Sequence, residues 1–144
     1  MLELDDSLYP VLVTRWAGET TLEELERFIA WYDGQLKKAI ERKDLIFSIS
    51  DAGSLLKSAP PVRKRVAEWM NLKTEAEVAV VLYSIMIIQN PIIRGVLTAV
   101  TWMSNRKETK IMRSVEDALA LAETALPERG IPLPQGFALR RKAR

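Results

Sequence analysis

The chain has 144 residues, of which 48% are hydrophobic and 28% charged, and it contains 6 glycines and 7 prolines. These values are typical of one globular domain and exclude a disordered or collagen-like chain. The sequence has no Cys and no His. It therefore cannot form a thiolate or imidazole metal site, a thiol nucleophile or a His-based catalytic triad. We expect a protein that is not an enzyme and that carries no cofactor and no metal.

The formal net charge of +2 is too balanced to indicate a nucleic-acid partner. The charge is unevenly distributed, because residues 1–126 carry −2 and residues 127–144 carry +4. The amino terminus lacks a basic region followed by an apolar stretch, so we expect no secretory signal and a cytoplasmic location. The longest uncharged apolar run, residues 78–93, holds 16 residues and contains Asn90-Pro91. A spanning helix needs roughly 20 residues, so we expect no membrane span.

The first elements along the chain are predicted to be a β-hairpin and a helix. Strand-like residues at 2–4 and 8–16 flank the polar turn 5–7, and Gly18 ends the second strand. Thr20 and Thr21 precede Glu23 and Glu24 by three residues, which is the spacing of a capping box. Apolar residues then recur every three or four positions, which predicts a helix that ends near Lys43.

A strand at 45–49 is expected next, because this β-rich run shows no alternation of apolar and polar residues. It is either covered on both faces or central in the sheet, and a turn at 51–54 closes it. Ser58 precedes Ala59-Pro60-Pro61, so it is expected to cap a second helix that continues toward Glu77. Residues 78–83 are predicted to form a third buried strand, and 85–88 are interpreted as its end or as a loop.

The remaining pattern predicts a helix, a short strand and a final helix. Asn90 and Pro91 begin the first helix, residues 109–113 form the strand, and Ser114 caps the last helix. The alternation of strands and helices favours an α/β fold with four to five strands in a largely parallel sheet, an N-terminal hairpin and four helices. We expect one domain at 1–126 and a basic tail containing Pro and Gly at 127–144, either mobile or docked.

Several positions give the chain a family resemblance over roughly residues 1–126. They are the opening hairpin, Gly18 before Thr-Leu-Glu-Glu, Asp51, Arg63-Lys64-Arg65 before Trp69, Arg94-Gly95 before Trp102, and Ser114-Val-Glu-Asp-Ala-Leu. With this order of elements, the chain resembles the bacterial STAS-like proteins. These belong with the sulfate-transporter and anti-sigma-factor-antagonist domains and are sometimes labelled SEC14-like.

The resemblance implies a regulatory signalling module that binds a protein partner and performs no chemistry. Its best-known members are switched by phosphorylation of a Ser at the start of the helix after the second core strand. Ser58 occupies that place here, with Ser54 as a second candidate phospho-acceptor, although the family's Asp-Ser-Ser-Gly signature is absent. The alternative for Ser58 is a helix cap without a switching role.

Eight residues form the candidate interaction surface: Asp51, Arg63, Lys64, Arg65, Ile92, Arg94, Trp102 and Phe137. The basic triplet is either a solvated helix face or a site for an acidic partner. Trp102 and Ile92 lie off the inward stripe of their helix, so they belong either to the core or to a partner or homo-oligomer interface. Asp51 is expected to cap a loop. Phe137 is expected to anchor the tail if the tail docks.

Two functions remain open from the sequence. The first is a protein-interaction module that uses the strand-end loops and the start of the second helix. The second is a small-molecule or lipid-binding carrier of SEC14-like type, in which residues 85–88 line a pocket. An internal cavity would favour the carrier, and a solid core with an exposed apolar patch would favour the interaction module.

Overall fold

A computed structural model describes residues 1–92, 94–95 and 109–137. Five strands form one sheet in the order β1-β2-β3-β4-β5. Their bounds are β1 Leu2–Leu8, β2 Val11–Thr20, β3 Ile46–Ser58, β4 Val81–Ile87 and β5 Thr109–Met112. β1 pairs with β2 antiparallel, and the other three pairs are parallel. The expected α/β class, with a hairpin and a largely parallel sheet, is confirmed.

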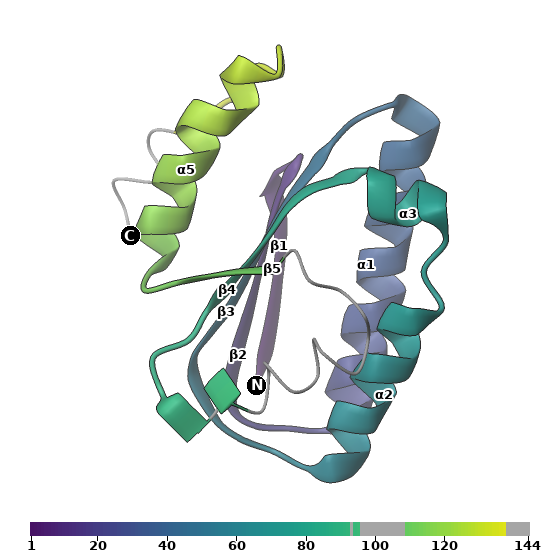
Figure 1. Ribbon diagram of the computed structural model, residues 1–144, viewed down its shortest axis with the longest axis vertical. Helices are drawn as coiled ribbons and strands as arrows, with labels where there is room; N and C mark the ends of the chain where they lie inside the picture. Colours follow the sequence, from purple (N-terminus) through teal and green to yellow (C-terminus); the bar gives the residue numbers. More distant parts are fainter. Residues whose placement is uncertain (93, 96–108, 138–144) are drawn as a thin grey trace.

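The sheet lies between two helical layers (Figure 1). Helices α1 (Leu22–Arg42), α2 (Pro60–Asn71) and α3 (Glu75–Ala79) lie on one side, and α5 (Val115–Glu128) lies on the other. Each layer has its own hydrophobic cluster against the sheet. In the part of the chain described, no helix is long and apolar enough to cross a membrane.

The capping residues of α1 lie where the sequence predicts them. The Thr21 hydroxyl accepts a hydrogen bond from the Glu24 amide at 3.1 Å, and the Glu24 carboxylate accepts one from the Thr21 amide at 3.3 Å. At the other end, Lys43 closes the helix in the left-handed conformation. Free backbone groups at both ends therefore have local hydrogen-bond partners. Ser114 caps α5 through the Asp117 amide in the same way.

The turn of the N-terminal hairpin is not at 5–7, as the sequence suggested. Residues 5–7 lie within β1, and the chain reverses at Tyr9 and Pro10. The pairing shifts in register between Asp5 and Leu8, from Leu4↔Thr14 to Leu8↔Val11. It places the apolar residues at both ends of β1 in contact with the core, which outweighs the turn preference of the short polar run.

β3 is longer than expected, because residues 51–54 continue the strand instead of ending it. β2 also continues beyond Gly18, and the two strands stay paired as far as Thr20↔Ser58. Ser58 is therefore the last residue of β3 and does not cap α2. The cap is Ala59, which makes no side-chain hydrogen bond, and the prolines of the first turn lack amides that would need a partner.

The second predicted helix is divided in two. α2 ends at Asn71, and a new capping box between Thr74 and Glu77 begins α3. Val78 consequently lies in a helix, and β4 starts at Val81 and includes residues 85–87, for which the sequence leaves strand end and loop open. The first turn of the helix expected at Asn90 is described, and the Asn90 side chain accepts from the Ile92 amide at 2.9 Å. The rest of that expected helix, from residue 96 on, lies outside the described residues.

The segment after α5 contributes to the core on the α5 side of the sheet. α5 continues to Glu128, two residues beyond the expected end of the domain. Phe137 is only 3% exposed and belongs to the cluster that includes Phe47 and Leu126, with Ile131 and Leu133 packed beside it. Residues 129–137 therefore lie against the domain.

Candidate functional site: a pocket between the sheet and helices α1 and α2

The two faces of the central strands differ in polarity. On the α5 side, β3 and β4 contribute apolar residues that are almost completely buried, namely Phe47, Ile49, Ile85 and Ile87. On the side of α1 and α2, the same strands contribute Ser48, Ser50 and Ser84. A buried sheet face that only needed to pack would be apolar, so these hydroxyls point to a second role.

Three hydroxyl side chains stand in register across neighbouring strands. Ser48 of β3 is opposite Ser84 of β4, and Ser84 is opposite Thr109 of β5. We call these three residues the hydroxyl row. A second pair, Thr14 and Ser50, lies two residues further along β2 and β3. All five side chains line the same pocket.

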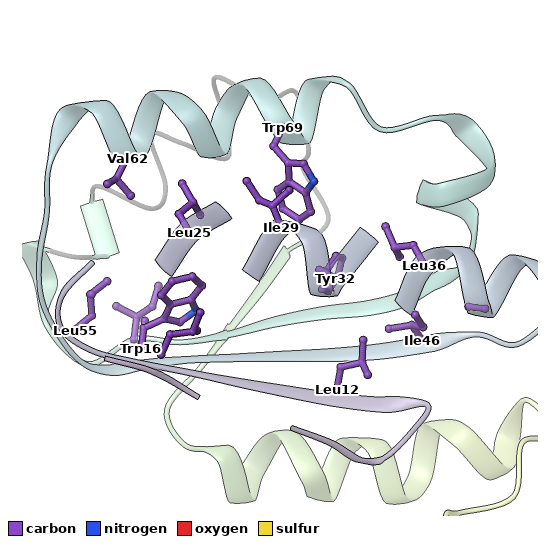
Figure 2. Packing of buried hydrophobic residues seen from close by; sticks show 14 residues of the cluster. Leu12, Trp16, Leu25, Ile29, Tyr32, Leu36, Ile46, Leu55, Val62 and Trp69 are labelled. Atoms are coloured by element: carbon purple, nitrogen blue, oxygen red, sulfur yellow. The ribbon is translucent and has the colours of Figure 1, made fainter. Parts of the chain in front are cut away.

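Four aromatic side chains line the pocket. Trp16 comes from β2, Phe28 and Tyr32 from α1, and Trp69 from α2. Figure 2 shows Val62 and Trp69 extending from α2 toward α1 and the sheet, with Trp16 and Leu55 on the sheet side. The rings meet edge to face, with centroids 5.1 Å apart for Trp16 and Phe28 and 5.5 Å apart for Tyr32 and Trp69. This is a preferred arrangement of aromatic pairs.

The pocket has a volume of about 150 Å³. Its other lining residues are mostly small or apolar: Thr20, Leu25, Ala52, Leu55, Ser58, Val62, Val66, Met70 and Met86. Within the described residues, no carboxylate, ammonium or guanidinium group lines it. The arrangement can hold an uncharged molecule by van der Waals contact and offer it hydroxyl groups.

The hydroxyls of the floor differ in their hydrogen bonds. Ser50 accepts from the Trp16 indole at 3.1 Å, and Thr14 donates to the Ile49 carbonyl at 3.4 Å. The Ser48 and Ser84 side chains have no hydrogen-bond partner among the residues that the structure describes, and neither hydroxyl is completely shielded from solvent. Ser48 is nevertheless only 9% exposed. A hydroxyl in such a place needs a water or a ligand as partner, because an unmade hydrogen bond is unfavourable.

A charged cluster fixes Trp69 from outside the pocket. The Trp69 indole donates to the Asp33 carboxylate at 2.9 Å, and the ammonium of Lys73 contacts the same carboxylate. Lys73 also pairs with Glu77 at 3.3 Å and lies 4.6 Å from the centre of the Trp69 ring. Burial alone would raise the pKa of Glu77, but bonds from Thr74 and Lys73 outweigh it, and the pKa is lowered. The cluster joins α1, α2 and α3 around one pocket wall.

The predicted phospho-acceptors lie in different surroundings. Ser58 lines the pocket and its backbone carbonyl accepts from Arg63 at 2.6 Å. Ser54 is exposed on β3. Asp51, expected to cap a loop, lies within the strand, where its carboxylate accepts from the Gly53 amide at 3.0 Å.

Two of the three bases of the predicted surface have partners within the chain. Arg63 contacts the Ser58 carbonyl, and Arg65 forms an ion pair with Glu26 at 2.6 Å. Lys64 is exposed. Arg94 is exposed and Ile92 is 76% exposed. Phe137 lies in the core, and Trp102 lies outside the described residues.

Sequence reasoning missed the hydroxyl row, although a signal for it exists. Ser48 and Ser50 alternate with Phe47 and Ile49 in a segment that was interpreted as lacking alternation. Ser84 repeats the pattern between Tyr83 and Ile85 in the next strand. Serines at alternate positions of two buried strands indicate a polar patch on one face of the sheet.

The fold described above can be compared with known proteins. Neither the family models nor the curated proteins give a match. A solved structure does: an uncharacterized protein of the DUF3478 family from Shewanella loihica PV-4, described as having a SpoIIAA-like fold. It superposes with a TM-score of 0.58 at 18% identity, over 83% of this chain and 90% of that chain. This chain has a SpoIIAA-like fold. The STAS-like architecture expected from the sequence is thereby confirmed.

The SpoIIAA-like scaffold offers few metal ligands. Among the described residues, no three acidic side chains lie close enough together to hold a metal ion, and the sequence provides no His or Cys. The pocket presents several hydroxyl groups to one small volume.

Proposed function

We propose that this SpoIIAA-like domain is a non-catalytic module that binds a small uncharged molecule in the pocket between the sheet and helices α1 and α2. The single observation that carries the proposal is the row of serine and threonine hydroxyls on the floor of a mostly apolar pocket. Concave, mostly apolar sites with a few convergent polar groups are the usual form of small-molecule sites in proteins. Between the two functions left open by the sequence, the presence of this pocket favours the carrier.

The proposal predicts that filling the pocket abolishes binding without unfolding the protein. Ser84→Leu adds an apolar side chain at the floor, whereas Ser54→Leu makes the same change at an exposed position of β3. Amide chemical shifts would be followed by NMR during titration with neutral one-ring compounds and short alcohols. The native protein and Ser54→Leu should show shifts confined to pocket residues. Ser84→Leu should bind the same compounds at least tenfold more weakly. No pocket shift in the native protein with any compound would refute the proposal.

Exposed apolar residues at one edge of the sheet support a second function, which is protein interaction. Leu56 is 75% exposed on β3, and Leu22 and Ile92 are exposed at the carboxyl ends of the neighbouring strands β2 and β4. This is the edge at which the STAS-like resemblance places partner binding. Clustered exposed apolar residues commonly mark protein interfaces. We therefore keep a regulatory protein-interaction role as the alternative.

The alternative predicts that a charge at this edge removes the contact. Leu56→Asp should abolish cross-links to a protein partner in the native cell, because a carboxylate in the centre of an interface is costly to desolvate. Leu72→Asp, at an equally exposed Leu (77%) beyond the other end of α2, is the matched control and should keep them. The cross-linked species would be identified by mass spectrometry. Equal cross-linking by the two variants would exclude this edge as the interface.

A further inference from the structure

The lining residues and the volume of the pocket indicate the chemical class of its ligand. Resting on the function proposed above, we infer that the ligand is a neutral molecule with one aromatic ring and a hydroxyl or carbonyl group that contacts Ser48 and Ser84.

The first step concerns charge. The described lining has no acidic or basic side chain that could neutralise an ionised ligand. The charged cluster of Asp33, Lys73 and Glu77 is already internally paired behind Trp69. An ion transferred into such a site would lose its hydration without gaining a counter-charge, so the ligand is uncharged.

The second step concerns size. A cavity of about 150 Å³ matches the volume of an engineered cavity in another protein that binds benzene. One ring with a small substituent fills this volume, whereas a long acyl chain would extend beyond it. The SEC14-like alternative is thereby restricted from lipids to small molecules.

The third step concerns shape. Trp16, Phe28, Tyr32 and Trp69 form a connected set of rings, and Phe28 and Trp69 meet at 5.6 Å with an interplanar angle of 73°. A further ring can adopt the same edge-to-face geometry against this set. A saturated ring of equal volume would lack that interaction, so the wall favours an aromatic ligand.

The fourth step concerns polarity. The Ser48 and Ser84 hydroxyls stand side by side in the β3–β4 register and have no partner among the described residues. A hydroxyl can both donate and accept a hydrogen bond. A ligand with one hydroxyl or carbonyl group satisfies this pair, whereas a pure hydrocarbon leaves both hydroxyls unmatched.

Five probes separate these properties in a calorimetric and NMR titration of the full chain at pH 7. They are phenol, toluene, cyclohexanol, benzoate and palmitate. We expect phenol to bind at least threefold more tightly than cyclohexanol and toluene, and at least tenfold more tightly than benzoate and palmitate. Shifts should be confined to the pocket residues.

Ser48→Ala isolates the role of the hydroxyl row. This variant should lower the affinity for phenol three- to tenfold and leave the affinity for toluene unchanged. Ser54→Ala should change neither affinity. If any of the other four probes binds as tightly as phenol, the ligand class inferred here is wrong and the proposed binding function stands. If neither the five probes nor the other neutral one-ring compounds and short alcohols shift the amide signals of the pocket residues, the inferred ligand class and the proposed binding function are both wrong.

Discussion

Replacing Phe137 with Ala is expected to lower the free energy of unfolding by about 3 kcal/mol, which corresponds to a melting temperature roughly 10 °C lower. Phe137 is 3% exposed and contacts the cluster on the α5 side of the sheet. Truncation to Ala removes buried ring surface and leaves a cavity, because the strand residues opposite cannot all move in to fill it. Urea denaturation followed by circular dichroism measures the loss.

Gln135→Ala provides the control for this prediction. Gln135 is exposed two residues earlier in the same segment, so its removal should change stability by less than about 0.5 kcal/mol. Equal stabilities for the native protein and Phe137→Ala would mean that residues 129–137 do not contribute to the core. The pocket lies on the opposite face of the sheet, so probe binding at 25 °C should survive in the folded fraction of Phe137→Ala.

Replacing Asp33 with Ala is expected to cost about 2 kcal/mol of stability and to weaken ligand binding at the same time. The Lys73 side chain is 6% exposed and would keep only Glu77 as a counter-charge. The Trp69 indole would lose the acceptor that holds its ring against the pocket. The cost is below that of a fully buried ion pair because Asp33 is partly exposed.

Asp33→Asn separates the two roles of Asp33. An amide oxygen can still accept from the Trp69 indole but cannot neutralise Lys73. We expect Asp33→Asn to lose stability but to keep most of the phenol affinity, whereas Asp33→Ala loses both. Chemical denaturation gives the stability, and the calorimetric titration gives the affinity. Unchanged stability in both variants would show that the cluster of Asp33, Lys73 and Glu77 does not fix the helices.

These two predictions concern opposite faces of one sheet. The α5 face is a packed apolar core closed by Phe137, and the other face combines packing with a hydroxyl-lined pocket. Because the same strands supply both faces, alternate residues of β3 serve different purposes. Changes at Phe47 or Ile49 would therefore affect stability, and changes at Ser48 or Ser50 would mainly affect binding.

Several features of the fold are determined locally and could be predicted from the sequence. The capping box at Thr21 and Glu24, the apolar stripe of α1 and the Ser114 cap depend on residues within one or two helical turns. The alternation of strands and helices gave the α/β class and the largely parallel sheet, because parallel strands need crossover connections. The same local reasoning failed at residues 5–7 and 51–54, where polar residues lie inside strands.

The tertiary structure decided those strands and the pocket. Residues 51–58 stay extended because β2 offers backbone partners as far as Thr20, and a partner strand is not visible in a local pattern. The hydroxyl row exists only because the register aligns Ser48 with Ser84 and Ser84 with Thr109. Trp69 reaches the same pocket because Asp33, on another helix, accepts its indole hydrogen. Contacts of this kind join residues 25 to 38 positions apart. Their geometry is set by how the elements pack, which short-range sequence preferences do not encode.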